Sequence, residues 1–260
     1  MKQSNIFWGT ALILLGGLFF LQAQGIIDNV FTLIWPLALI LFGGWIILGV
    51  YWKPSLSDEE TFSVPLESAK SVRLKFANGA GQVEIKGGAP AGVAIVGSSA
   101  VGMNHSSHLS GDRLDVKVEA GPSVIPFIGP STGIWRYRLT QDVPVTLKVE
   151  AGASRLDIDL SDVRATHFEL STGASSTDLV VPARGASVLD FEAGAASINI
   201  RVPESTAARI RVKEGVTAMN VDQTRFPQLD SGMYQSANFD SAVDRAEITI
   251  EGGLGSVTIK

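Results

Sequence analysis

The stretch TLKVEAGASRLDIDLSDVRATHFELSTGASSTDLVVP, residues 146–182, contains one pattern twice. In each copy, alternating apolar residues lead to a Gly-Ala-Ser triplet, and a second alternating run follows it. The two glycines, Gly152 and Gly173, lie 173 − 152 = 21 residues apart. Because alternation with a period of two is typical of β-strands, the stretch predicts two successive strand pairs of the same design.

The same pattern recurs on both sides of this stretch. Six segments align on a glycine, and the four central glycines keep the 21-residue spacing. A repeat of this length is too short for a unit that contains a helix. It is typical of a β-solenoid, in which coils stack about 4.8 Å apart around a continuous core. The aligned glycines are Gly79, Gly152, Gly173, Gly194, Gly215 and Gly253.

The apolar positions change parity at each glycine. Leu147 and Val149 are odd-numbered, whereas Leu156 and Ile158, beyond Gly152, are even-numbered. Side chains alternate between the two faces of a strand, so both runs can face one core only if the chain bends between them. Each aligned glycine is therefore predicted to be a structural corner, where a residue without a Cβ can adopt positive φ.

Two parts of the repeat region are less regular. Residues 88–141 are expected to form irregular coils or an inserted hairpin. Between Gln223 and Val243 an insertion lengthens the interval from Gly215 to the next aligned glycine to 253 − 215 = 38 residues, and we expect it to be a long loop. The strands expected in the first of these parts are 93–96, 114–118 and 135–139.

The first 53 residues differ in composition from the rest. Asp28 is the only charged residue in 6–52, and two apolar runs, 6–23 and 30–52, are each long enough to cross a bilayer. A cleaved signal peptide is the alternative for the first run, but only Lys2 precedes it and a second apolar run follows directly. We therefore expect a two-helix transmembrane hairpin. The expected domains are 1–53, the hairpin; 54–65, a linker; and 66–260, an all-β solenoid.

Charge predicts the topology and excludes one class of partner. Lys2 and Lys53 flank one side of the hairpin and the loop 22–29 carries no positive charge, so the positive-inside rule places the soluble domain in the cytoplasm. Without these lysines and Asp28, 19 basic and 25 acidic residues remain, a formal charge of 19 − 25 = −6 with no basic cluster. Nucleic acid is therefore not expected as a partner.

No motif predicts a catalytic, cofactor-binding or metal site. The chain has no cysteine, which excludes thiolate ligands, disulfides and cysteine nucleophiles. NGAGQVEIKGG, residues 78–88, fits a corner better than a phosphate loop, because no helical pattern follows it. His105 and His108 lack a third ligand nearby, and LDIDLSD, residues 156–162, lacks the spacing of calcium loops. We expect a protein that is not an enzyme, and only carboxylates clustered on one solenoid face would favour action on polysaccharides.

One apolar segment is the candidate contact with a partner. In PSVIPFIGPSTGIWRY, residues 122–137, apolar side chains stand among prolines and glycines that do not continue a strand. These side chains either contact a partner protein or the bilayer, or they cap one end of the solenoid core. They are Phe127, Ile128, Ile134 and Trp135.

Parts of the sequence resemble two known bacterial families. WPLALILFGGWIILG, residues 35–49, resembles the transmembrane region of the LiaI/LiaF-like family. VEAGASRLDIDLSDV and FELSTGASSTDLVVP resemble the toast-rack β-solenoid domain attached to that region and to many other bacterial envelope proteins. The resemblance covers nearly the whole chain and implies a role in the cell-envelope stress response, where LiaF-like members act on a sensor histidine kinase as non-enzymatic regulators. This chain has two predicted spans instead of the four common in that regulator.

The expected function is that of a non-enzymatic regulator or sensor of envelope stress, anchored in the bacterial cell membrane and presenting its solenoid as a binding surface. The expected partners are the lipid bilayer and a sensor histidine kinase or another membrane protein. The alternative is a self-associating structural scaffold or an adhesin-like envelope protein.

Overall fold

The computed structural model describes residues 60–100, 102–120, 134–213 and 218–260, together with six single residues between 22 and 43. Among these residues, no helix has the length and apolar character needed to cross a membrane. The predicted spans 6–23 and 30–52 lie almost wholly outside the described part of the chain. Ser55–Lys260 forms a compact unit of its own.

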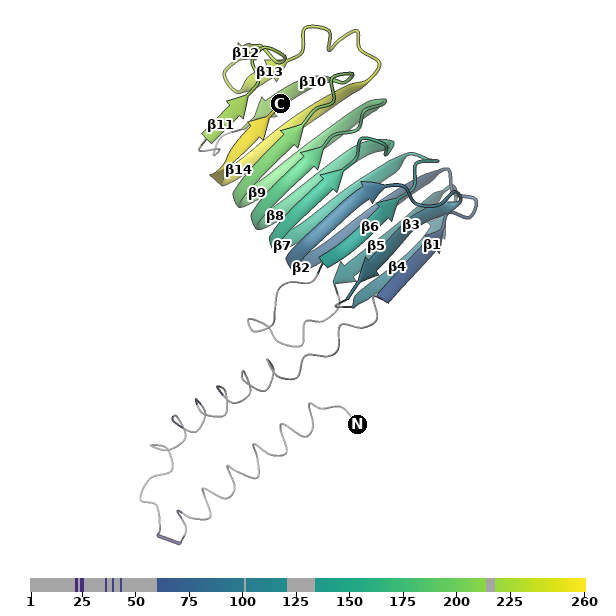
Figure 1. Ribbon diagram of the computed structural model, residues 1–260, viewed down its shortest axis with the longest axis vertical. Helices are drawn as coiled ribbons and strands as arrows, with labels where there is room; N and C mark the ends of the chain where they lie inside the picture. The colour runs from purple at the N-terminus through teal and green to yellow at the C-terminus, as the bar shows by residue number, and fades with distance from the viewer. Residues whose placement is uncertain are drawn as a thin grey trace. The chain divides into compact units, whose positions relative to one another are not determined.

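Fourteen β-strands run through the described part of this unit and join one hydrogen-bonded sheet (Figure 1). Alternating side chains rich in valine, isoleucine and leucine favour strands throughout. The strands are β1 (Glu60–Pro65), β2 (Ser71–Gly87), β3 (Val93–Ser99), β4 (Met103–Ser110), β5 (Arg113–Ala120), β6 (Ile134–Leu139), β7 (Val145–Asp159), β8 (Ala165–Val180), β9 (Ala186–Arg201), β10 (Ala207–Val212), β11 (Ala218–Val221), β12 (Gln228–Asp230), β13 (Met233–Gln235) and β14 (Arg245–Ile259).

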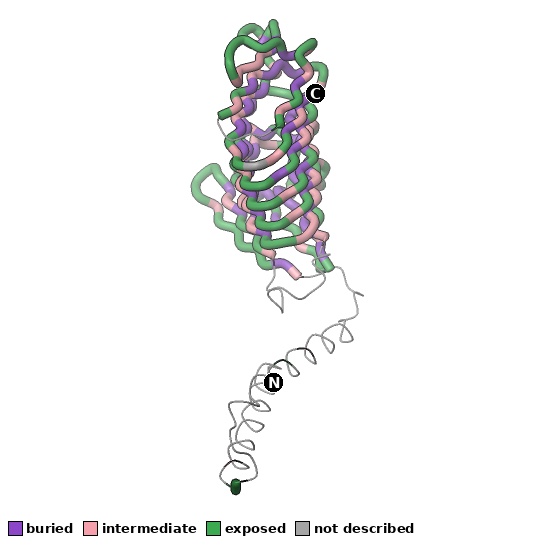
Figure 2. Tube along the Cα trace, turned by 90° about the vertical axis from the view of Figure 1, so that its left-hand side faces the viewer, coloured by how far each residue is buried: buried purple, intermediate pink, exposed green. Residues whose placement is uncertain are grey.

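Five long strands form the body of the sheet. They lie side by side in parallel, in the order β2, β7, β8, β9, β14. From β7 to β9 the register advances by the predicted 21 residues, because Ala151 pairs with Thr172 and Thr172 with Ala193. Each long strand passes through one aligned glycine, which divides it into a first and a second arm, and the sheet folds over there (Figure 2). The predicted all-β solenoid with 21-residue coils is confirmed.

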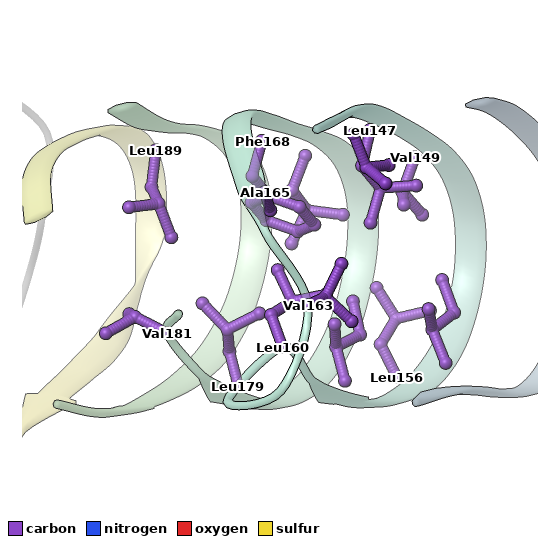
Figure 3. Packing of buried hydrophobic residues seen from close by; sticks show 14 of the residues in the cluster. Leu147, Val149, Leu156, Leu160, Val163, Ala165, Phe168, Leu179, Val181 and Leu189 are labelled. Atoms are coloured by element: carbon purple, nitrogen blue, oxygen red, sulfur yellow. The ribbon is translucent and has the colours of Figure 1, made fainter. Parts of the chain in front are cut away.

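The burial pattern confirms the change of parity at the corners. In β7, Leu147 and Val149 are buried before Gly152, and Leu156 and Ile158 are buried after it. Figure 3 shows that such side chains from the two arms of successive coils meet inside the coils. Both arms therefore face one core, which requires the bend that the sequence predicts.

The C-terminal strand does not take the place that its position in the chain predicts. A coil order that followed the chain would put β14 beyond β10 and β11. Instead β14 pairs with β9 on one side and with β10 and β11 on the other, all in parallel. Both arms of β14 suit this central position, because Ile248, Ile250, Val257 and Ile259 are all buried.

At the N-terminal end, β5 and β6 form the next coil outward from β2. β5 pairs with the first arm of β2 and β6 with its second arm, both in parallel. Antiparallel strands follow, with β4 on β5, β3 on β6 and β1 on β3. The strands expected within 88–141 are thus confirmed with wider bounds. The linker expected over 54–65 is wrong in its second half, because Glu60–Pro65 is β1 and buries Val64 in the core.

At the C-terminal end, the insertion 223–243 covers the core instead of forming a long loop. It contains β12 and β13, which extend the sheet beyond β10, and it buries Phe226 and Phe239. Arg209 of β10 stacks on the Phe239 ring at 4.2 Å and pairs with Asp240 at 2.8 Å. The insertion has no periodic pattern, and its two phenylalanines are buried because the last coil would otherwise leave the core open.

Candidate binding surface at the glycine corners

The corners of the five long strands line up into an open trough of about 980 Å³, here called the corner trough. At about 4.8 Å per strand it is about 19 Å long. Three rows of residues line it, in matching register from strand to strand, and the middle row is Asn78, Ala151, Thr172, Ala193 and Gly252. The glycine row is Gly79, Gly152, Gly173, Gly194 and Gly253, and the row two positions earlier is Ala77, Glu150, Ser171, Glu192 and Glu251.

Close approach between neighbouring coils explains why glycine occupies the corners at Gly152 and Gly194. A Cβ on Gly152 would lie 2.4 Å from the carbonyl oxygen of Gly79, and a Cβ on Gly194 would lie 2.7 Å from that of Gly173. Side chains at these positions would push the coils apart, because real Cβ atoms are essentially never so close to other atoms.

The described corner glycines do not adopt the positive φ that the sequence predicts. None of Gly79, Gly152, Gly173, Gly194 and Gly253 has φ in the left-handed region. Positive φ, at 134°, occurs instead two residues past the first corner, in Gly81. The sixth predicted corner, Gly215, lies outside the described residues.

Carboxylates line the corner trough on three of its five strands. Lys75 pairs with Glu150 at 2.8 Å and Lys213 pairs with Glu251 at 2.8 Å, whereas Glu192 forms no ion pair within the described part of the chain. The hydrogen bond from Lys75 is the main cause that lowers the pKa of Glu150, and the hydrogen bond to Glu251 raises the pKa of Lys213. The corner trough can therefore attract a cationic group, most directly at Glu192.

Buried polar groups lie beneath the corners. Asn78 and Thr172 are buried, and the Thr172 hydroxyl has no hydrogen-bond partner among the residues that the structure describes. The Ser154 hydroxyl likewise has no partner among the described residues, whereas Asn78 interacts with the Tyr137 hydroxyl and partly opposes the rise in the pKa of Tyr137 that burial causes. An unsatisfied buried polar group costs about 1–3 kcal/mol. Ordered water molecules are the usual way in which such groups are satisfied.

The structure describes only half of the predicted contact segment. Phe127 and Ile128 lie outside the described residues. Trp135 of β6 is 6% exposed and its Nε1 donates a hydrogen bond to the carbonyl of Gly102 at 3.3 Å, so it belongs to the core and is not available to a partner. Ile134, at the start of the same strand, is half-buried. The capping alternative therefore fits Trp135 better than partner contact does.

The other polar motifs of the sequence lie apart from the corner trough. His105 and His108 are exposed on β4, and the ring of His105 stacks on Phe62 with centroids 4.3 Å apart. Asp157 forms an ion pair and Asp159 accepts hydrogen bonds within its own turn. Across the ranges that the structure describes, no group of three or more histidine, aspartate or glutamate side chains could hold a metal ion.

Sequence reasoning missed the carboxylates of the corner trough, although a signal for them exists. A Glu-x-Gly triplet recurs at three aligned glycines and supplies Glu150, Glu192 and Glu251. Only the strand order brings the last two together, because Glu192 of β9 pairs with Glu251 of β14. A repeated glutamate at one corner position is therefore informative once the neighbouring coils are known.

One solved structure has a similar architecture. A solved structure of a candidate cell adhesion protein from Clostridium sporogenes ATCC 15579 has a TM-score of 0.70 at 18% identity, over 78% of this chain and 98% of its own. A solved structure of a candidate adhesin from Bacteroides fragilis NCTC 9343 has a TM-score of 0.21 at 8% identity, over the same shares of the two chains. No curated protein matches the chain significantly.

A family model assigns the chain directly. The model for the N-terminal domain of toast_rack, DUF2154, matches residues 53–201, which is 149 of the 260 residues. This range runs from before β1 to the end of β9 and includes the first four aligned glycines. The Clostridium structure shares the fold at an identity too low to indicate more than that. The chain therefore belongs to the toast-rack family, whose N-terminal domain occupies more than half of its length.

Proposed function

We propose that this chain is a non-enzymatic protein of the bacterial cell envelope, anchored in the membrane, whose solenoid binds a partner through the corner trough. The observation that carries the proposal is the trough itself, an open surface across five paired strands that aligns Glu150, Glu192 and Glu251. Groups held on a hydrogen-bonded sheet lose little conformational entropy on binding. The apolar runs 6–23 and 30–52 support the membrane anchor.

The proposed partner is a membrane protein of the envelope stress response, and the resemblance to LiaF-like regulators favours a sensor histidine kinase. The carboxylates of the corner trough favour a cationic segment on that partner, because opposite charges steer encounter and fix orientation. The proposed location of the solenoid is the cytoplasm, supported by the lysines at positions 2 and 53.

Replacing the three trough glutamates by glutamine is expected to remove most partner capture without unfolding the domain. Exposed ion pairs contribute about 0–1 kcal/mol each, so Glu150→Gln, Glu192→Gln and Glu251→Gln together should shift unfolding by only a few degrees. Capture is measured in membranes with a photoreactive amino acid at Ser171, which lines the corner trough. The adducts are identified by mass spectrometry, and a sensor kinase adduct that the triple variant loses is the expected result.

The matched control carries the photoreactive amino acid at Arg201, which is exposed at the end of β9 and does not line the corner trough. Kinase capture at Ser171 but not at Arg201 supports the trough as the binding surface. Equal capture at both positions, or undiminished capture by the triple variant, contradicts it.

Topology tests the proposed location separately. A reporter enzyme that is active only outside the cytoplasm is expected to be inactive when fused after Lys260. Reporter activity would place the solenoid outside, and wall-derived ligands would then replace a cytoplasmic kinase segment as the candidates.

A self-associating scaffold or adhesin-like protein is the second candidate. The shared fold with a structure described as a candidate cell adhesion protein favours it. The capture experiment separates the two candidates, because adducts made only between copies of this chain favour the scaffold and a captured kinase favours the regulator.

A further inference from the structure

Four strands in the described ranges pair on one side only: β1, β4, β11 and β12. Three of them carry features that discourage another strand from joining. β1 has a register shift and ends in Pro65, β11 has four residues, and β12 has three residues with a register shift and Asp230. Short, interrupted or charged edges are the means by which natural sheets avoid unwanted pairing.

β4 has none of these protections. All eight of its residues pair with β5 without a register shift, from Met103 opposite Ala120 to Ser110 opposite Arg113. Its sequence, MNHSSHLS, contains no proline, lysine, arginine, aspartate or glutamate, and the residues 104–108 are all exposed. β4 is therefore a long and regular edge of the kind that templates a further strand.

Contacts on its inner side already hold β4 in place. Met103 is buried, and the Trp135 side chain donates a hydrogen bond to the carbonyl of Gly102 just before the strand. The His105 ring lies nearly parallel to the Phe62 ring, at an interplanar angle of 11°. An edge fixed in this way needs little ordering to accept another strand, which favours binding.

We propose that β4 pairs with β4 of a second copy of this chain, antiparallel about a two-fold axis, so that the sheets of the two copies become continuous. The composition of β4 fits self-pairing, because two identical strands without lysine, arginine, aspartate or glutamate bring no such like charges opposite one another. A two-fold axis also makes the outward N–H and C=O groups of the two strands mutually complementary. One strand from each copy makes a small contact, so the dimer is weak and reversible.

The symmetry makes a prediction about single positions. Residues opposite each other in an antiparallel pair share a face of the sheet, so the axis must pass beside one residue, which then lies opposite its own copy. The Cα atoms of those two copies would be about 4.5–5.5 Å apart, within the roughly 4.4–6.8 Å that a disulfide requires. A residue one position further along lies opposite a residue two positions away from itself, and its two copies are too far apart to form a disulfide.

Single cysteines at the positions 104–108 test the proposal, because the chain has no cysteine of its own. In the full chain, in bacterial membranes under mild oxidation, we expect one position to form a disulfide-linked dimer at least about five-fold above its neighbours. Ser231→Cys is the matched control, since Ser231 is exposed beside the turn between β12 and β13, and it is expected to stay monomeric.

Three results would overturn the proposal. Equal yields at all five positions would indicate random collision instead of strand pairing. Yields no higher than that of Ser231→Cys would show that β4 does not meet its own copy. A disulfide from β4 to a different protein would show that the edge accepts another partner. Kinase capture at the corner trough does not depend on any of these outcomes.

Discussion

Gly152→Ala is expected to lower the unfolding midpoint of the solenoid by roughly 4–8 °C. The new Cβ would lie 2.4 Å from the carbonyl oxygen of Gly79, so β7 would have to move away from β2 at the corner. Overpacking of this kind costs about 2 kcal/mol, and a domain of this size loses about 2–4 °C per kcal/mol. Circular dichroism of the full chain in detergent, followed during heating, measures the shift.

Gly79→Ala is the matched control at the first corner. A Cβ there would meet no atom within 4 Å, and the φ of Gly79 is not in the left-handed region. Alanine also restricts the unfolded chain more than glycine does, so this variant should unfold at or slightly above the parent temperature. Equal losses in Gly79→Ala and Gly152→Ala would mean that the corners need glycine for its backbone freedom, which would contradict the close-approach explanation.

The remaining corners extend the same series. A Cβ on Gly194 would lie 2.7 Å from the carbonyl oxygen of Gly173. A Cβ on Gly173 would lie 3.4 Å from the carbonyl oxygen of Gly152. Gly194→Ala should therefore resemble Gly152→Ala, whereas Gly173→Ala should lose much less stability. The loss of stability should therefore increase as the distance from the new Cβ to the carbonyl oxygen of the neighbouring coil decreases. The sequence around these glycines does not reveal this difference.

Phe226→Ala is expected to destabilise the domain by about 3–5 kcal/mol, the usual loss for a fully buried phenylalanine. Phe226 is 0% exposed and belongs to the core, although it comes from the insertion between the last two coils. The Arg225 guanidinium stacks on its ring at 4.9 Å and donates hydrogen bonds to the carbonyls of Val202 and Pro203. The truncation leaves a cavity beside these contacts, and urea unfolding measures the loss.

Leu229→Ala is the matched control for Phe226→Ala within the same insertion. Leu229 is 60% exposed on β12, so its truncation should change the free energy of unfolding by no more than about 0.5 kcal/mol. If the two variants were equally stable, the insertion would be the loop that the sequence suggested, and its contribution to the cap would be refuted.

The two ends of the solenoid differ in how their edges are protected. At the C-terminal end, the insertion covers β10 and fills the end of the core with Phe226 and Phe239. At the N-terminal end, β4 keeps a regular open edge. No residue of β4 lines the corner trough, so two copies joined through β4 would leave both troughs accessible. Self-pairing and partner binding are therefore compatible in one assembly.

By itself, the sequence determined the all-β solenoid, its 21-residue coil and the places where the coils turn. Alternation along Leu147 to Val149 and its change of parity after Gly152 are local properties, because side chains alternate on any strand regardless of its neighbours. The strands β3, β5 and β6 were predictable for the same reason, whereas β4, which lacks the alternation, was not predicted. The glutamates of the corner trough were visible as a repeated Glu-x-Gly, but their meeting at one surface was not.

Only the tertiary structure decided which coils are neighbours and which corners require glycine. β14 lies between β9 and β10 because Gly252 pairs with Ala193, 252 − 193 = 59 residues earlier. A local sequence pattern does not show which of several strands a given strand will pair with. The tight contact of Gly152 with Gly79 likewise spans 152 − 79 = 73 residues. Burial of Phe226 depends on the end of the sheet that the insertion covers, and burial of Trp135 depends on the segment at Gly102 that packs against it. Each of these features is a contact between segments that are far apart in the sequence. Such a contact depends on the close packing of the folded chain and not on the local sequence of either segment.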